Sequence, residues 1–276
     1  MSNRTKRMKT LLGVSAALSL LAPQDAQAID RNTTDPRAIM QAAAEQQGGE
    51  RGLSRMKMTI RQGSSTRERA MTVRTWRQAE VRKVLILIEA PEDVRNTGFL
   101  TLDYAAKERA DEQWLYLPAL HRVSRVPSSG KSDAFVGSDF SISDLSGVEP
   151  ADYDFQLLEV NAKVGDEECW LIESIPRNDE VRAKTGYSKG QIWVSKSKLI
   201  PIQFKAWTLS PGKTKYFKAG EIKLVDGVWT PHRLQMRTLQ EGGAASETLI
   251  EVLSVKNRAD EVSDADFTQR RLERGI

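Results

Sequence analysis

Apolar and polar side chains alternate along most of this chain. Met56, Met58 and Ile60 are each followed by a polar or charged residue, and Met71 and Val73 repeat the pattern. A period of two predicts strands that bury one face. Eleven further segments have a strand-like composition: 83–89, 99–104, 113–117, 121–126, 154–163, 168–175, 191–195, 201–209, 214–225, 228–240 and 246–256. The chain is therefore expected to form about thirteen strands.

Turn residues separate these segments. Asp226-Gly227 divides two of them by the two residues that a tight hairpin needs, and Gly242-Gly243 marks another turn. No helical pattern is evident between consecutive strands. Short strands joined by turns predict a mostly β fold with a few helices, in which a curved antiparallel sheet curls or closes.

Helix signals lie near the two ends of the chain. Asp35 is an N-cap and Pro36 a first helical residue for a helix expected over 36–47. Ser263 is an N-cap for a second helix, expected over 263–274.

The first 28 residues have the features of a secretory signal peptide. Four basic residues precede an apolar run at 11–22, and Ala26-Gln27-Ala28 is a small-residue cleavage site. The apolar run has about twelve residues, whereas a membrane span needs about twenty. We therefore expect cleavage after Ala28, a soluble periplasmic protein without stable membrane insertion, and a single domain over residues 29–276.

The charge and the cysteine content of the chain argue against two classes of function, nucleic-acid binding and cysteine-based catalysis. Residues 1–28 hold four of the 41 Lys and Arg and one of the 37 Asp and Glu, which leaves 37 basic and 36 acidic side chains. A nearly neutral chain gives no electrostatic support for binding nucleic acid. Cys169 is the only cysteine, and its strand position beside Trp170 favours a buried apolar side chain over a nucleophile.

No set of catalytic residues stands out. Ser138 lacks the glycine spacing of a nucleophile elbow, and the only histidines, His121 and His232, lie in predicted strands. Lys131 follows a glycine but lacks the earlier glycine of a phosphate-binding loop. Two histidines and one cysteine make a metal site unexpected. We predict no catalytic residue, no metal and no cofactor, and hence a protein that is not an enzyme.

Three passages of the sequence resemble a known family. The most specific is 114–145, WLYLPALHRVSRVPSSGKSDAFVGSDFSISDL, and the segments 190–207 and 227–236 support it. Their order is similar to that of the LolA-like outer membrane lipoprotein-sorting proteins, and the resemblance extends over 35–272. Ser195 stands where many of these carriers have an aspartate, which leaves the hydrogen bonding of that turn open.

The resemblance implies a half-open β-barrel that is covered by helices and holds acyl chains in a hydrophobic cavity. The strand at 84–88 is apolar on both faces and so must be covered on both sides. Six aromatic residues either line such a cavity or belong to an ordinary core: Trp76, Trp114, Tyr116, Trp193, Phe204 and Trp207. Arg122 and Arg125 lie on opposite faces of one strand, so only one can contact a headgroup or lid; both can instead face solvent.

A loop over residues 128–147 contains the candidate lid, the segment 135–145. It is rich in Ser, Gly and Asp, and loops of this length are commonly functional or mobile. Its predicted gate residues are Phe135, Gly137, Asp139, Phe140, Asp144 and Leu145. The apolar ones are expected to close over a cavity, and the two aspartates to hydrogen-bond the loop's own backbone. A short helix is expected at 141–145.

Together these features favour a carrier. Burying one CH₂ contributes about 0.8 kcal/mol, so a sixteen-carbon chain represents on the order of ten kcal/mol of gross transfer energy. A groove alone can therefore hold a lipidated protein or an amphiphilic lipid for transfer across the periplasm. The resemblance implies an inner-membrane RND-type exporter as a partner. The alternative is a non-carrier scaffold or assembly subunit of an envelope complex that uses the same fold with a filled core.

Overall fold

One antiparallel sheet dominates the fold. The computed structural model describes residues 29–46, 48–106, 109–127, 130–146, 149–243 and 245–275, and the expected signal peptide at residues 1–28 lies outside them. Within these residues, thirteen strands form a single open sheet. Their bounds are β1 (Arg51–Gln62), β2 (Ser65–Arg77), β3 (Val81–Ala90), β4 (Gly98–Tyr104), β5 (Glu112–Leu117), β6 (Arg122–Arg125), β7 (Tyr153–Val164), β8 (Glu167–Pro176), β9 (Tyr187–Ser195), β10 (Pro201–Thr208), β11 (Lys213–Val225), β12 (Val228–Gln240) and β13 (Ser246–Lys256). The expected mostly β fold and its strand number are confirmed.

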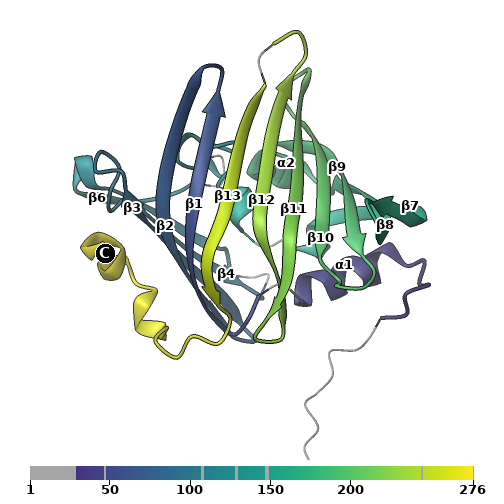
Figure 1. Ribbon diagram of the computed structural model, residues 1–276, viewed down its shortest axis with the longest axis horizontal. Helices are drawn as coiled ribbons and strands as arrows, with labels where there is room; N and C mark the ends of the chain where they lie inside the picture. Colours follow the sequence, from purple (N-terminus) through teal and green to yellow (C-terminus); the bar gives the residue numbers. More distant parts are fainter. Residues whose placement is uncertain are drawn as a thin grey trace, which may run out of the picture.

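The order of the strands explains why the sheet stays open. It runs β6-β5-β4-β3-β2-β1-β13-β12-β11-β10-β9-β8-β7, so consecutive strands are neighbours except where β1 pairs with β13. That pairing joins two meanders into one strongly curved sheet (Figure 1). The edges are β6 and β7. The chain between them must therefore cross from one edge of the sheet to the other.

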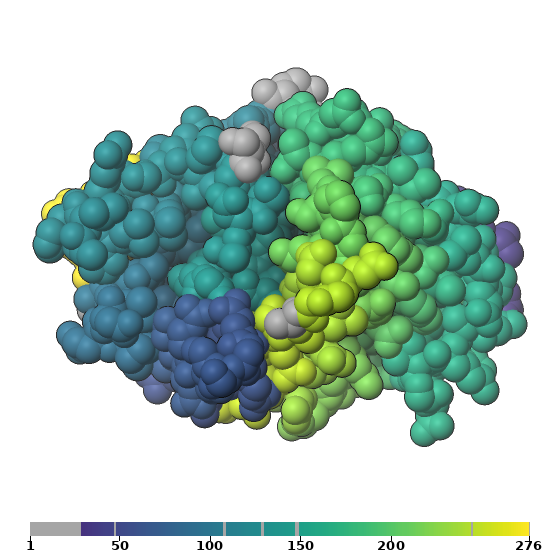
Figure 2. Space-filling view, turned by 90° about the horizontal axis from the view of Figure 1, so that it is seen from above, coloured from purple at the N-terminus to yellow at the C-terminus, as the bar shows by residue number. Residues whose placement is uncertain are grey.

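This crossing segment fills the hollow of the sheet. Figure 2 shows the teal residues of this part of the chain between the two halves of the sheet. Its described residues contain three short 3-10 turns: η3 (Phe135–Gly137), η4 (Ser143–Leu145) and η5 (Pro150–Asp152). The short helix expected at 141–145 is confirmed as η4. We call the sheet face that contacts residues 130–146 the inner face, and the opposite one the outer face.

The tight turn at Asp226-Gly227 is confirmed. It joins β11 to β12 with Val225 opposite Val228. Asp226 has a φ of 53° and Gly227 a φ of 83°, and positive φ at both central residues is the geometry that matches the twist of a hairpin.

Three α-helices occur in the described part of the chain: α1 (Pro36–Glu45), α2 (Asp179–Thr185) and α3 (Gln269–Arg274). The first is capped as expected, because the Asp35 carboxylate accepts hydrogen bonds from the backbone N–H groups of Arg37 and Ala38. Its buried residues pack on the inner face against β8 and β9. No helix in the described residues is long and apolar enough to cross a membrane.

Two expectations about helices were wrong. The sequence indicated no helix between the predicted strands 168–175 and 191–195, but α2 lies between β8 and β9, where Asn178 caps its first turn and Gly186 ends it at a φ of 76°. The helix expected over 263–274 is broken, because Phe267 leaves helical geometry and Thr268 caps the separate helix α3. The preceding turn is η6 (Asp264–Asp266), which Ser263 caps as predicted.

Both faces of β3 are covered, as its composition predicts. On the inner face, Val84, Ile86 and Ile88 pack against Phe135 and Phe140 of the crossing segment. On the outer face, the C-terminal part of the chain packs over β3, β4 and β5. The cover is therefore the chain's own loop and tail, without a second sheet.

Candidate functional site

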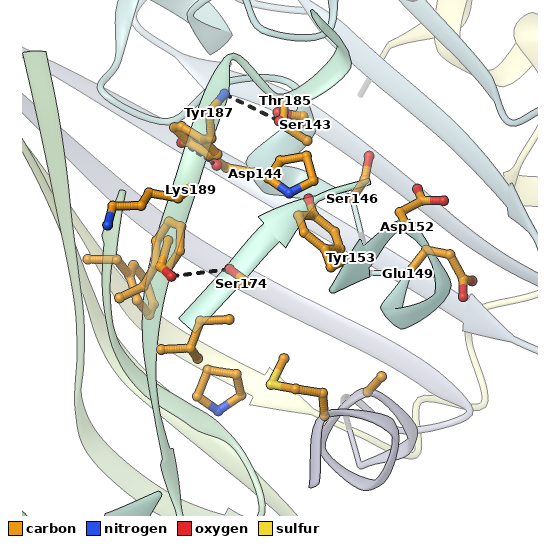
Figure 3. A pocket seen from close by; sticks show the side chains of 18 of the residues that line it. Ser143, Asp144, Ser146, Glu149, Asp152, Tyr153, Ser174, Thr185, Tyr187 and Lys189 are labelled. Atoms are coloured by element: carbon orange, nitrogen blue, oxygen red, sulfur yellow. Dashed lines mark hydrogen bonds between the residues drawn. The ribbon is translucent and has the colours of Figure 1, made fainter. Parts of the chain in front are cut away.

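A pocket lies on the inner face between α1, α2, the turns η4 and η5, and strands β7 to β12 (Figure 3). Its volume is about 260 Å³. Alternate residues of a regular strand point to the same face. The pairing of β9 with β10 shifts register at two places, and β9 contributes Tyr187, Lys189, Gly190 and Ile192 to the wall. The crossing segment supplies the remaining side.

Apolar side chains line most of this pocket: Met40, Ala43, Phe140, Phe155, Ile192, Phe204, Phe217 and Met236. Phe204 meets Tyr187 edge-on, with ring centroids 5.8 Å apart. Gly190 on the neighbouring strand leaves room for the Phe204 ring, since a Cβ at Gly190 would lie 2.4 Å from it. The wall can accept an alkyl chain, because apolar burial has no directional requirement.

Polar side chains gather on one side of the pocket (Figure 3): Ser143, Asp144, Ser146, Glu149, Asp152 and Thr185. Lys184 also lines the pocket. The Lys184 ammonium lies 3.4 Å from the Asp111 carboxylate and 3.9 Å from that of Asp152. Burial and the nearby Asp152 charge raise the pKa of Tyr153 to about 12, so its phenol stays neutral. An apolar wall with a polar side suits an amphiphile.

Asp144 ties the crossing segment to the sheet. Its carboxylate accepts a hydrogen bond of 2.7 Å from the Tyr187 phenol and one of 2.8 Å from the Ser141 N–H. The Lys215 ammonium lies 3.4 Å away, and the side chains of Asp144 and Lys215 are both 12% exposed. Burial, followed by the charge of Asp144, raises the pKa of Tyr187 well above its ordinary value. The phenol is thus a permanent donor.

Two further polar anchors hold the same segment. Asp139 accepts hydrogen bonds from the hydroxyls of Thr248 and Ser246 on β13, and its N–H donates to Thr248 Oγ1. Lys131 is buried, with its ammonium 3.8 Å from Asp111, and burial lowers its pKa. The two aspartates were expected to hydrogen-bond the backbone of their own loop. This prediction is wrong for Asp139, whose carboxylate bonds to strand β13. Asp144 accepts one such bond but also bonds to Tyr187 on β9.

The apolar gate residues are buried on the inner face. Phe135 packs edge-on against Phe99, with centroids 5.8 Å apart, and Phe140 against Phe217 at 6.4 Å. Leu145 packs against the same cluster. Gly137 adopts a φ of 74°, and its carbonyl accepts a long hydrogen bond from a guanidinium of β2. The structure therefore places the predicted gate inside the barrel as a plug.

The six aromatic residues predicted for a cavity are divided between the two faces. Phe204 lines the pocket. Trp76, Trp114 and Tyr116 pack on the outer face with the C-terminal part of the chain. Trp193 packs with the buried residues around Cys169. The structure brings only Phe204 of the six into this pocket.

Trp207 lies on the opposite face from Phe204, three residues along the same strand. Its ring stacks with the ammonium groups of Lys189 and Lys205, at 4.7 and 4.4 Å from the ring centroid. Arg122 and Arg125, the predicted polar contacts, are exposed on the edge strand β6, and the Arg125 guanidinium lies 5.8 Å from the centroid of Trp114. Trp207, Arg122 and Arg125 do not line the pocket, although Lys189, which Trp207 contacts, does.

Several residues of the pocket were missed from the sequence. Tyr187 and Ile192 belong to β9, whose start was placed four residues late, and Phe217 and Met236 are ordinary residues of correctly predicted strands. Their alternation marked a buried face. No signal in the sequence showed that this face meets α1.

The turn after β9 shows how Ser195 is hydrogen-bonded in the position where many of the related carriers have an aspartate. Its hydroxyl accepts a hydrogen bond of 3.0 Å from the Lys198 N–H and donates one to the Glu167 carboxylate. Burial alone would raise the pKa of Glu167. Hydrogen bonds from Lys198, Ser195 and Ser197 outweigh this effect, so the pKa of Glu167 is lowered. Serine thus fills the capping role that an aspartate would have there.

Reactive groups are sparse in the described residues. Cys169 is fully buried, as expected, and burial raises the pKa of its thiol to about 11. His121 is not a strand residue, since it ends η1 in a left-handed conformation with a φ of 46°. No group of three His, Cys, Asp or Glu in the described part of the chain could hold a metal ion. The site's evident capacity is binding.

Comparison with known structures gives the class of the fold. A LolA superfamily protein from Nitrosomonas europaea is 19% identical, over 86% of this chain and 98% of its own, with a TM-score of 0.62. A Vibrio parahaemolyticus domain named as an outer membrane lipoprotein-sorting protein is 26% identical, with coverages of 86% and 98% and a TM-score of 0.76. A DUF1329 family protein from Desulfovibrio piger is 24% identical, with coverages of 86% and 97% and a TM-score of 0.76. The fold is LolA-like.

Sequence comparison gives the family. A family model described as "Uncharacterized protein" matches residues 80–274, more than half of the chain. No match was found among the curated proteins. The chain belongs to this family, whose fold is that of the LolA-like outer membrane lipoprotein-sorting proteins, so the predicted resemblance is confirmed.

Proposed function

We propose that this protein is a periplasmic carrier that binds the acyl chains of lipoproteins or of other amphiphilic lipids on the inner face of its sheet. The observation that carries the proposal is the inner-face pocket, which is apolar along β9 to β12 and polar beside η4 and η5. An amphiphile likewise has an apolar part and a polar part. The LolA-like fold adds support, because one relative is named for outer membrane lipoprotein sorting.

The small size of the pocket supports the inference that the protein also has an open form. Its 260 Å³ lie just below the range of about 300–1,000 Å³ that holds drug-sized ligands. Phe135 and Phe140 pack on the inner face beside strands β3 and β4. A long acyl chain would need their space, so we infer that the segment over residues 130–146 moves out when cargo enters, which makes it a gate.

The remaining parts of the proposal concern the route. A signal peptide over residues 1–28 would deliver a single domain over residues 29–276 to the periplasm. An inner-membrane RND-type exporter would be the partner, as for related carriers. Purification without detergent followed by native mass spectrometry tests cargo binding, and osmotic-shock release tests the compartment.

The filled inner face favours a second function. If the plug never moves, the protein is a scaffold or assembly subunit of an envelope complex with a LolA-like fold. A fluorescent fatty-acid probe separates the two functions, because only a carrier takes it up saturably. Absence of both co-purified lipid and probe uptake would support the scaffold.

A further inference from the structure

An exposed hairpin tip lies at one end of the long axis of the molecule. β5, η1 (Pro118–Leu120) and β6 form this hairpin at the edge of the sheet (Figure 1). Leu120 is 66% exposed and Leu117 is 37% exposed. The left-handed conformation of His121 ends η1 and returns the chain to β6, which leaves Leu120 at the tip. Single exposed leucines are common, so these two alone indicate no function.

Arginine side chains on β6 and on the helix α3 distinguish this edge of the sheet. Arg122 and Arg125 on β6 are exposed, and so are Arg270 and Arg274 on α3, which packs against β5 and β6. None of the four forms an ion pair with an acidic side chain of the described residues. The mature chain is nearly neutral, so such a group of unpaired cations is a local feature.

Few carboxylates offset these cations. In the neighbouring turn between β3 and β4, Glu92 already pairs with Arg95 at 3.4 Å. Asp93 in that turn and Glu273 on α3 are exposed. Among the described residues of this edge, the four unpaired arginines therefore outnumber the two carboxylates that form no ion pair, and these residues carry a net positive charge.

We propose that this leucine-tipped basic edge docks the protein on an anionic phospholipid surface. Leucine side chains insert at the boundary between headgroups and acyl chains, while arginines remain among the phosphates. A protein partner fits less well, because a stable protein interface buries about 800 Å² on each side and a hairpin tip offers two apolar side chains. The docking edge is separate from the pocket, which is built from α1, α2, η4, η5 and β7 to β12.

Vesicle flotation tests this proposal. The full-length mature protein is mixed with phosphatidylethanolamine vesicles in which about a quarter of the lipid is phosphatidylglycerol, or with phosphatidylcholine vesicles. We expect the protein to float with the anionic vesicles only, and less at high salt, because salt screens the arginines. Leu120→Asp and the double variant R122E/R125E should each reduce the floating fraction by roughly tenfold.

Two controls keep the test specific. Leu253→Asp removes a leucine that is 67% exposed on β13, and it should leave flotation unchanged. Phe204→Asp alters the pocket and should also leave flotation unchanged, which separates docking from cargo uptake. Absence of flotation, equal flotation on phosphatidylcholine, or an equal loss in Leu120→Asp and Leu253→Asp would overturn the proposal, whether or not the probe binds in the pocket.

Discussion

The Tyr187 phenol donates a hydrogen bond of 2.7 Å to the Asp144 carboxylate, and this bond joins strand β9 to the turn η4. It connects the wall of the pocket to the segment that plugs the barrel. Because burial and Asp144 raise the pKa of Tyr187, its folded pKa lies above its unfolded one. The stabilisation is therefore fully present below the ordinary tyrosine pKa of about 10 and is lost only as the pH rises beyond it.

Tyr187→Phe should loosen the plug without unfolding the protein. A hydrogen bond to a charged group contributes about 1.5–3 kcal/mol, so the urea midpoint should fall accordingly. Hydrogen exchange of residues 130–146 should speed up more than that of the sheet. Tyr216→Phe, on the outer face, is the matched control and should change neither quantity. Equal exchange of residues 130–146 in the wild type and Tyr187→Phe would contradict the role of this bond.

Phe204→Asp should abolish uptake of a fluorescent fatty-acid probe. A carboxylate in the apolar wall would have to be desolvated without a partner when the chain enters. Trp207→Asp is the control on the same strand, since Trp207 lies on the outer face between Lys189 and Lys205. Probe titration of both variants, after circular dichroism confirms folding, makes the comparison. Equal loss in both would place the binding site elsewhere.

Phe140→Ser should change the retention of bound lipid, whereas Ser138→Ala should not. Phe140 is buried, lines the pocket and meets Phe217 edge-on, so its loss weakens the closed plug. The Ser138 hydroxyl bonds only to the backbone of Phe140, at 3.2 Å, and no chemistry is assigned to it. The rate of probe release measures the difference. Identical release from the two variants would argue against a gate.

Cys169 should be inert in the folded protein. With a pKa of about 11, only about a thousandth of the thiol is ionised at pH 8, and the thiolate is the reactive form. Iodoacetamide should therefore leave it unlabelled at pH 8 and modify it fully in urea. Mass spectrometry gives the extent of labelling, and rapid native labelling would show that β8 opens locally.

Gly98→Ala should displace helix α3 from the outer face. A Cβ at this position would lie 2.6 Å from Leu272 Cδ1, and overpacking of this kind costs about 1–3 kcal/mol. Leu272→Ala alone should cost about 2–5 kcal/mol by leaving a cavity. In the double variant the clash disappears, so its loss of stability should be smaller than the sum of the single losses. Strict additivity in urea unfolding would exclude this contact.

Local patterns in the sequence located the strands well, because each depends on neighbouring residues. The alternation of Met56, Met58 and Ile60 marks β1, and Asp226-Gly227 sets the turn after β11. The short helix α2 was missed although Asn178 and Gly186 were visible as caps, because seven residues hold too little periodicity. The capping residues were the signal in the sequence that could have located this helix.

The faces of the aromatic residues could not be predicted in the same way. Strand β3 is apolar on both faces, so its pattern does not say which face is inner. Trp76 and Trp114 became outer residues because the C-terminal part of the chain packs over them. Phe204 became a pocket residue because α1 and the crossing segment lie on its side of the sheet.

The strands, the turns, the capped helix α1 and the family could be predicted from the sequence alone, since these follow from neighbouring residues and from a long motif. Tertiary structure decided which face is the inner one and what fills it. The pairing of β1 with β13 leaves β6 and β7 as distant edges, so the segment between them has to cross the inner face. That crossing brings Asp144 to Tyr187 and Asp139 to Thr248. Contacts between residues so far apart in the sequence depend on how the whole sheet curves, and no local sequence pattern predicts that curvature.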